Sequence, residues 1–377
     1  MARATAFRQA AFSPLRRMAC VLAMAVLVAC GDGGDGPSRR PRGEWLKGDL
    51  HLHSSHSNDA LDNPVGAVIA KAEELGMDYF VFTDHDNHVQ GNITTWADPA
   101  YRSDKMVLLY GTEWTTARGH AGIFGTQPWD HSRLWAIRDG DGAASVAEAH
   151  ALGLHFSVNH PVNSDGWEHS FDIDFDSIEV WNATYVVPAQ NPRAIRRWDS
   201  ILAGGRRLSG RGGSDVHHQQ GVESTILNVG NPTTFIFSCE RTSAAILEAL
   251  KAGHVSISYA PSAERIDFEA DADGDQVFET SIGDNIDGTG QTIRFRIEIV
   301  GFRAGSTYDV RVLKDGATFQ SWQLDSPEQQ FEDTPAAGER AYYRVEVRGA
   351  VPDSPAEFAF VYGDFIAMTN PIYVSFP

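Results

Sequence analysis

The stretch WLKGDLHLHSSHSNDALD, residues 45–62, places a short apolar run directly before three histidines and an aspartate. The run has the character of a β-strand, and His51 and His53 follow it two positions apart. Residues i and i+2 of an extended chain point to the same side, so both imidazole rings can converge on one point without backbone distortion. A polar surface loop would explain each histidine singly but not this spacing, which indicates a metal site.

The chain beyond this stretch alternates apolar runs with helical patterns. WLKGDLHLH is followed by the helical segment NPVGAVIAKAEELG, in which Pro64 suits the first helical position and Gly76 the C-terminal end. The alternation continues through MDYFVFTDHD, MVLLYGTEWT, ASVAEAHALG, LHFSVNHP, SIEVWN, NPRAIRRWDSILAGG, RRLSGRGGSD, SAAILEALKAG and HVSISY. Parallel strands with helical crossovers are therefore expected.

From about residue 260 the pattern changes to strands separated by Gly, Asp and Pro turns, as in TIRFRIEIVG, STYDVRVLKDG and AYYRVEVRG. This predicts a β-sandwich domain over residues 260–377. Within it, DADGDQVFE spaces Asp271, Asp273, Asp275 and Glu279 as in a calcium loop, but no carboxylate stands at the twelfth position. A calcium ion held by the three aspartates and a solvated acidic turn are both compatible with this pattern.

The N-terminus carries features of export. Arg16 and Arg17 precede MACVLAMAVLVAC, an apolar run that is too short for a membrane span and is typical of a signal peptide over residues 1–29. LVAC, ending at Cys30, resembles a bacterial lipobox, which implies a lipid on that cysteine and a flexible tether over residues 30–43. The expected location is the bacterial cell envelope, periplasmic or surface exposed, with an ordinary secretory signal as the alternative.

The composition limits the partners of this chain. With 377 residues, 42% of them hydrophobic and 10% aromatic, it is long enough for two well-cored domains. The formal net charge is −19, and removal of a signal peptide that holds arginines but no acids makes it more negative. A protein that binds nucleic acid through its phosphates is basic, so no nucleic-acid partner is expected. The oligomeric state is not indicated.

Residues of metal-ligand type recur at the C-terminal ends of the expected strands, which is where the active site of an α/β barrel lies. They are His51, His53, Asp84, His85, Asp86, Glu113, His120, His160, Asp215, His217 and His218. One strand that ends in His or Asp would mean little, but five or six successive strands that do so indicate a metal centre.

The motifs DLHLHSSHSND, FTDHD, GTEW, GHAGIFG, VNHP and GGSDVHH, taken together in this order and spacing, resemble the polymerase and histidinol phosphatase (PHP) superfamily of metallohydrolases. The chain is most similar to the carbaryl-hydrolase-like branch, whose members often append a β domain ending in something like TNPIYV, here residues 369–374. The resemblance implies a distorted (β/α)7 TIM-like barrel over residues 44–259, followed by the β-sandwich.

The resemblance also implies nine ligands in three metal positions, filled by two or three divalent ions such as Zn, Mn or Fe. By position they are His51, His53, Glu113 and Asp215; Asp59, His85 and His217; and Glu113 again with His120 and His160. The spacing after the histidine pair leaves Asn58 and Asp59 as candidates. Asp59 is expected, because asparagine is a poor ligand for divalent metals.

Two cations held in this way lower the pKa of a bridging water to roughly 7 and neutralise charge on a phosphoryl oxygen. The expected function is hydrolysis of a small-molecule phosphomonoester or phosphodiester by the resulting hydroxide. Arg118 would clamp a phosphoryl oxygen, unless it is a solvated loop arginine. His88 or His218 would protonate the leaving group, unless they only orient a ligand.

The loop TQPWDHSRLWAIRDGD would wall a pocket for an apolar leaving group, or would simply pack locally. A carbamate or carboxylic ester hydrolase on the same site and a non-catalytic surface binding module are the alternative functions. The metal ligands do not rank these substrates, because a bridging hydroxide serves all of them.

Overall fold

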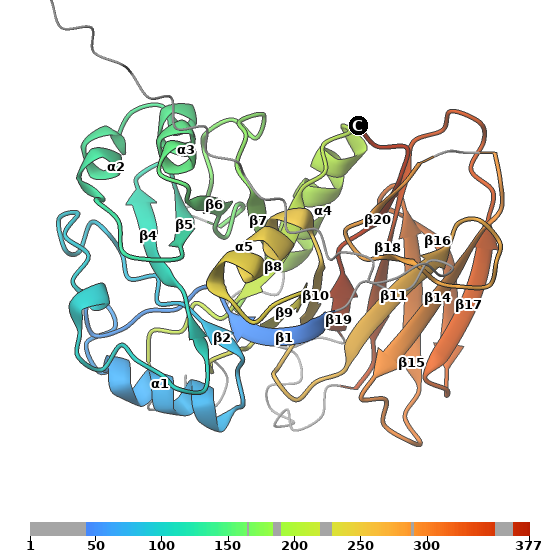
Figure 1. Cartoon of the computed structure of the whole chain (residues 1–377), viewed down its shortest axis with the longest axis horizontal. Helices are drawn as coiled ribbons and strands as arrows, with labels where there is room; N and C mark the ends of the chain where they lie inside the picture. Colours follow the sequence, from blue (N-terminus) through green and yellow to red (C-terminus); the bar gives the residue numbers. More distant parts are fainter. Residues whose placement is uncertain (1–42, 164–165, 184–189, 219–227, 288–289, 351–364) are drawn as a thin grey trace, which may run out of the picture.

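The computed structural model describes residues 43–377, apart from residues 164–165, 184–189, 219–227, 288–289 and 351–364. The predicted signal peptide and Cys30 lie outside the described residues. An α/β part and a strand-rich C-terminal part lie side by side (Figure 1). Over the described ranges, we find no helix with the length and apolar character needed to cross a membrane.

Four of the helices match those predicted from the sequence. The helices are α1 (Val65–Glu74), α2 (Ser132–Ile137), α3 (Gly142–Ala151), α4 (Gln190–Ala203) and α5 (Ser243–Ala252), with the 3-10 turn η1 (Thr95–Ala97). Helix α2 lies in the stretch that was predicted as a loop, and it buries only Leu134. A helix this short shows too little periodicity to be recognised in a sequence. Pro64 caps α1 rather than occupying its first helical position.

The described residues of the α/β part form ten strands. They are β1 (Glu44–Asp49), β2 (Tyr79–Phe80), β3 (Val107–Leu108), β4 (Tyr110–Thr116), β5 (Gly119–Gly125), β6 (His155–Val158), β7 (Ser177–Asn182), β8 (Ser209–Gly213), β9 (Thr233–Ser238) and β10 (Val255–Ser258). The parallel pairs β1–β2, β2–β3, β6–β7 and β7–β8 agree with the expectation.

Antiparallel strands β5 and β9 depart from the expected parallel pattern. β5 pairs with β4 and β6, and β9 pairs with β1 and β10. Only two residues connect β4 to β5, which permits a hairpin but not a helical crossover. The strands fall into two sheets, the five-stranded β4-β5-β6-β7-β8 and a larger one that holds β1, β2, β3, β9 and β10. A closed TIM-like barrel is therefore not confirmed.

The C-terminal part is built from strands that form two packed layers. They are β11 (Arg265–Asp271), β12 (Thr280–Ser281), β13 (Asn285–Ile286), β14 (Ile293–Val300), β15 (Tyr308–Lys314), β16 (Ala317–Leu324), β17 (Glu328–Asp333), β18 (Ala341–Arg348), β19 (Phe365–Thr369) and β20 (Ile372–Val374). One layer is the sheet β12-β11-β14-β17. Phe295 of this layer packs on Tyr343 of the other, with ring centroids 4.7 Å apart.

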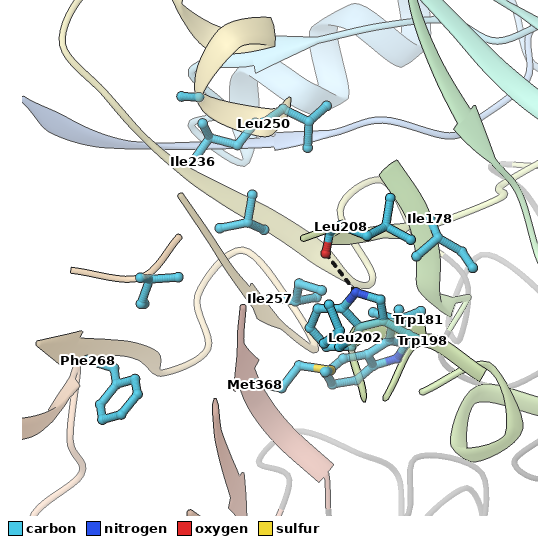
Figure 2. Close-up of a cluster of buried hydrophobic side chains, with 14 of the residues drawn as sticks. Ile178, Trp181, Trp198, Leu202, Leu208, Ile236, Leu250, Ile257, Phe268 and Met368 are labelled. Carbon is cyan, nitrogen blue, oxygen red and sulfur yellow. Dashed lines mark hydrogen bonds between the residues drawn. The ribbon is translucent and has the colours of Figure 1, made fainter. Parts of the chain in front are cut away.

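The second layer of the sandwich continues into the α/β part. Strand β19 pairs antiparallel with β10, so one eleven-stranded sheet runs through both parts. A shared apolar core lies along this junction (Figure 2), with Trp198 of α4 near Leu202 and Met368. The buried Trp198 indole donates a hydrogen bond to the Leu208 carbonyl at 2.8 Å.

Asn370, at the end of β19, joins the sandwich to the α/β part through its side chain. The side chain is fully buried, accepts from Gly210 N at 2.7 Å, and donates to Gly210 O at 2.7 Å and Val255 O at 3.3 Å. Gly210 lies in β8, which precedes Asp215 in the chain. The TNPIYV segment therefore supports the strand that leads to a predicted metal ligand.

We expect Asn370→Ala to lower the free energy of unfolding by about 2–4 kcal/mol, because the buried N–H and carbonyl of Gly210 in β8 lose the side chain that bonds to both of them. Urea unfolding followed by circular dichroism measures this change. The exposed Gln330→Ala on β17 is the control and should change stability by less than about 0.5 kcal/mol. Equal stability of the Asn370 and Gln330 variants would refute the proposed support of β8.

Candidate metal centre

Backbone pairing between strand ends brings the candidate ligands together from both sheets. Leu52 forms a bridge with Val216, and His85 forms one with Glu113. Asp215 N donates to His51 O at 2.7 Å across the first bridge. Residues that are far apart in sequence therefore meet at one point, and the side chains beside each bridge face the same space.

The carboxylate of Glu113, on β4, lies at the centre of the cluster and is fully buried. Five histidine nitrogens surround it within 3.6 Å: His51 Nε2 at 3.3 Å, His53 Nε2 at 3.6 Å, His85 Nδ1 at 2.9 Å, His120 Nδ1 at 3.3 Å and His160 Nε2 at 3.2 Å. Glu113 therefore lies beside ligands from all three expected metal positions.

Two aspartates complete the cluster on either side of Glu113. Asp215 Oδ1 lies 3.3 Å from His51 Nε2 and 3.2 Å from His53 Nε2. Asp59 Oδ2 lies 3.3 Å from His85 Nε2 and 3.5 Å from His217 Nε2. The structure thus places all nine expected ligands in one connected group, with Asp59 at the position for which Asn58 was the other candidate.

The donor set fits divalent transition-metal ions. Glu113 Oε2 and His53 Nδ1 are buried and make no hydrogen bond to any described residue, and Glu113 Oε2 faces imidazole nitrogens. Mixed imidazole and carboxylate donors suit Zn, Mn or Fe. Ligand atoms within 4.8 Å of one another form the groups His53, His85 and His217; His51, His53 and Glu113; His51, His160 and Asp215; Asp59, His85 and His88; and His85, Glu113 and His120.

These groups of neighbouring ligand atoms differ in detail from the three expected metal positions. His85 lies in a group with Glu113 and His120, and His160 lies in a group with His51 and Asp215. His88 also comes within reach of Asp59 and His85. Several ions could therefore share ligands across this cluster, as bridging carboxylates allow.

Mutual electrostatic effects set the charge states in the absence of ions. Burial opposes ionisation of Glu113, yet the nearby His51 and His85 hold its pKa well below the ordinary value. Burial, together with His217 and His85, lowers the pKa of His53 to about 3. His53 is therefore neutral at physiological pH, the state that a metal ligand requires.

A second layer of buried polar residues holds the ligands in place, with Glu179 of β7 at its centre. Glu179 Oε1 accepts from His51 Nδ1 at 3.0 Å and from Arg211 Nη1 at 3.0 Å. Glu179 Oε2 accepts from the His160 backbone N–H at 2.8 Å. A proton held on His51 Nδ1 leaves Nε2 to face Glu113 and Asp215, so Glu179 selects the imidazole tautomer that can bind a metal.

Asn159 links this layer to the central carboxylate. Its Nδ2 donates to Glu113 Oε1 at 2.8 Å, and its Oδ1 accepts from Arg211 Nη2 and from Gly122 N. Arg211 is fully buried and also donates to Ser157 Oγ at 2.7 Å. The network therefore connects β5, β6, β7 and β8 behind the ligands.

The backbone adopts uncommon conformations at the site. His160 has φ of 23° and Asp215 has φ of 52°, both positive for residues that carry a Cβ. Strained backbone of this kind is found where function requires a particular side-chain direction. Gly213 leaves the space needed here, since a Cβ at this position would lie 2.3 Å from Glu179 Oε1 and 2.4 Å from His51 Cβ.

The three predicted catalytic residues lie at different distances from this cluster. His88 is nearest, with Nδ1 3.7 Å from Asp59 Oδ1. His218 pairs with Asp62 at 2.6 Å, and its ring centroid is 6.4 Å from that of His217. Arg118 is exposed on the β4–β5 turn, donates to Gly140 O at 3.3 Å, and forms no hydrogen bond or ion pair with any of the nine described ligands.

Other polar residues of the strand ends stabilise loops instead. Asp84 accepts from the backbone and hydroxyl of Ser54 and from Thr95 Oγ1. Asp86 Oδ1 accepts from Thr115 N, and Asp86 Oδ2 contacts His131 at 3.1 Å. The third histidine of the opening stretch, His56, contacts Thr94 and Asp98 rather than the cluster.

The acidic loop of the C-terminal part uses its carboxylates within the loop itself. Asp271 accepts from Gly274 N at 2.7 Å and from Gln276 N at 3.0 Å. Asp273 accepts from Asp275 N, and Asp275 accepts from Val277 N. These hydrogen bonds stabilise the loop as an acidic turn. The calcium site stays a prediction.

The sequence analysis missed Glu179, Arg211 and Asn159. One signal was present: SIEVWN is an apolar strand interrupted by a charged residue, and a buried carboxylate requires a partner. Asn159 directly precedes His160, but no feature of the sequence relates it to Arg211.

Comparisons with known proteins agree with the PHP resemblance over part of the chain. The PHP domain model matches residues 49–129, a stretch that holds the ligands from His51 to His120. No curated protein matches the sequence. The carbaryl-hydrolase-like branch stays a prediction.

Two solved structures show weak similarity. A two-domain protein from Bacteroides vulgatus, described as containing a predicted PHP-like metal-dependent phosphoesterase, is 16% identical and aligns over 91% of this chain and 100% of its own, with a TM-score of 0.45. The CARDB domain of a Pyrococcus furiosus protein, in complex with di-metal ions, is 10% identical over 30% of this chain and 89% of its own, with a TM-score of 0.18.

We expect Glu179→Gln to weaken metal binding about 10- to 100-fold, because the amide would turn two donor hydrogens toward groups that themselves donate. Competition with a chromophoric chelator measures the affinity. Glu264→Gln is a matched control, since Glu264 is also buried and paired with an arginine, Arg303, but lies in the sandwich. Both variants should lose stability, whereas only Glu179→Gln should lose metal affinity; equal affinities would exclude a positioning role.

Proposed function

We propose that this protein is a metal-dependent phosphoesterase that hydrolyses a small phosphomonoester or phosphodiester. The observation that carries the proposal is the buried Glu113 carboxylate with five histidine nitrogens within 3.6 Å. Neutral imidazoles offer lone pairs and a carboxylate offers negative charge, so bound cations would satisfy both kinds of group together. The PHP domain match over residues 49–129 supports this proposal.

The residues would divide their roles according to position. Glu113 and Asp215 would bridge ions, because a carboxylate has two oxygens and each of these carboxylates contacts at least two histidines. The histidines and Asp59 would complete the coordination. Divalent ions bound there would supply an ionised water near neutral pH and positive charge for a phosphoryl oxygen.

A hydrogen-bond donor for the leaving group lies at the edge of the site. The backbone N–H of Asn58 donates to His88 Nδ1 at 3.1 Å, which places the ring proton of His88 on Nε2. Burial, and then the neighbouring His85, lowers the pKa of His88, which favours this neutral ring. His88 Nε2 would therefore donate a hydrogen bond to the leaving-group oxygen. The ring centroid of His88 lies 4.7 Å from that of His85, which places His88 better for this role than His218, whose Nδ1 is paired with Asp62.

The choice between phosphoesters and other esters rests on charge. Bound cations attract an anionic phosphoester more strongly than a neutral carbamate or carboxylic ester. Among the described residues, the exposed Arg118 is the nearest predicted anion clamp, and reaching substrate would require its side chain to leave Gly140. The resemblance to the carbaryl-hydrolase-like branch makes carbamates the first alternative substrates to assay.

We further propose that the chain is anchored to the bacterial envelope by a lipid on Cys30. The support is the lipobox-like LVAC and the glycine-rich segment that follows it. A substrate outside the inner membrane would then be a small phosphoester of the periplasm or the surroundings.

Glu113→Gln should lower kcat/KM for an activated aryl phosphate ester by about 10²-fold or more, because it removes the charge that holds cations together. Release of 4-nitrophenol from its phosphate monoester and diester measures the rate in metal-replete protein. Arg118→Ala is the comparison and should lose less, since Arg118 could only orient substrate. Efficient cleavage of carbamate or carboxylic esters without any phosphoester cleavage would show that the protein is a carbamate or carboxylic ester hydrolase and not a phosphoesterase.

Chelation should abolish activity, and added Zn, Mn or Fe should restore it. Elemental analysis should find at least two ions per chain, and His53→Ala should reduce that number. A protein that binds its metals but cleaves none of these ester classes would favour the non-catalytic binding module.

Cys30→Ala should move the protein from the membrane fraction to the soluble fraction, because one residue carries the whole anchor. Fractionation with immunodetection measures this, and mass spectrometry of the wild type should show a lipid on an N-terminal Cys30. An unmodified soluble N-terminus in the wild type would rule out the anchor.

A further inference from the structure

A pocket remote from the metal centre opens between the two parts of the molecule. It is lined by Trp45, Phe237, Asp267, Glu269, Phe278, Glu279 and Ser281, and its cavity volume is about 50 Å³. Trp45 lies near the start of β1, whereas His51 follows the end of that strand. Six residues of extended chain separate the two sites by roughly 20 Å.

The pocket combines aromatic walls with an excess of negative charge. Asp267 pairs with Arg265 at 3.0 Å, and Glu269 pairs with Arg296. Glu279 contacts neither arginine in these pairs, so three carboxylates face two guanidinium groups. The surplus is one negative charge, beside the further carboxylates of the acidic loop.

Glu279 carries a carboxylate oxygen that has no hydrogen-bond partner among the described residues. Its Oε1 accepts from Ala272 N at 3.2 Å, but its Oε2 is buried and forms no hydrogen bond within the described ranges. Burial first, and then the carboxylates of Asp273 and Asp271, raise the pKa of Glu279. A cation in the pocket would relieve this unfavourable environment.

The aromatic walls favour one kind of cation. Trp45 and Phe237 pack edge to face with ring centroids 5.5 Å apart. Arg265 lies 4.7 Å from the Trp45 ring centroid, and Arg296 lies 4.5 Å from that of Phe278, so this region already holds cations against aromatic faces. Aromatic rings attract cations through their negative faces, and most strongly those that are weakly hydrated.

The hydrogen-bonding capacity distinguishes among organic cations. Asp267 and Glu269 accept hydrogen bonds from arginines, whereas Glu279 Oε2 is buried and accepts none from the described residues. A primary ammonium carries three donors, each of which needs an acceptor. A quaternary ammonium has none to satisfy and needs only negative charge and apolar contact.

We propose that this pocket is a binding site for a quaternary ammonium head group. Trp45, Phe237 and Phe278 form its walls, and Glu279 supplies the opposing charge. The ligand would lie at the junction of β1 and β9 with β11 and β12, where it would touch both parts of the protein. This site is independent of the metal centre and of the reaction proposed there.

Titration of the full-length protein with choline chloride tests the proposal, followed by saturation-transfer NMR of the choline methyl groups and by tryptophan fluorescence. Sodium chloride at equal ionic strength controls for screening, and calcium chloride tests an inorganic cation. We expect saturable choline binding that weakens about 5- to 30-fold in Glu279→Gln and in Phe278→Ala. Neither variant should change the metal content of the protein.

Two matched variants separate the pocket from general effects. Phe319→Ala removes an exposed aromatic ring on β16, and Glu332→Gln neutralises a carboxylate on β17 that also pairs with an arginine, Arg294. Both should bind choline as the wild type does. The proposal is wrong if choline does not bind saturably, if all four variants bind it equally, or if calcium alone gives a response that depends on Glu279.

Discussion

The central constraint in this structure is the fully buried carboxylate of Glu113. A carboxylate removed from water costs several kcal/mol unless positive charge and hydrogen-bond donors surround it. Among the described residues, Asn159 donates a hydrogen bond to it from a neutral amide, and the five neighbouring groups are imidazoles. Although burial opposes it, the neighbouring carboxylates raise the pKa of His51 and His85, so without metal protons on these rings supply the positive charge. Bound divalent cations would supply this charge and leave the imidazoles neutral.

The rigidity of the site comes from the layer behind the ligands. Glu179 and Arg211 form a fully buried ion pair, and such pairs contribute little net stability because desolvation offsets their attraction. We interpret the pair as serving orientation: it directs His51 and, through the backbone N–H, His160. The positive φ values of His160 and Asp215 fit the same view, because strain persists only where surrounding contacts enforce it.

The C-terminal part is integrated with the α/β part rather than merely attached to it. Strand β19 extends the sheet from β10, Asn370 bonds to β8, and Arg344 pairs with Asp199 of α4 at 2.8 Å. The pocket lined by Trp45 and Glu279 lies along the same junction. The eleven-stranded sheet therefore contributes to both the candidate metal centre and the junction pocket, while Glu113 lies on the five-stranded sheet.

The sequence by itself determined the local features: the α/β pattern up to residue 259, the strands beyond it, four of five helices, and the ligand types at the strand ends. These features depend on the periodicity of hydrophobic residues and on the chemistry of individual side chains, and short stretches of sequence are enough to define both. Only the tertiary structure decided the antiparallel β5 and β9, the two separate sheets, and the pairing of Glu179 with Arg211. Strand order and buried pairing arise from contacts between distant residues, and no local pattern specifies which distant residue will supply the compensating charge.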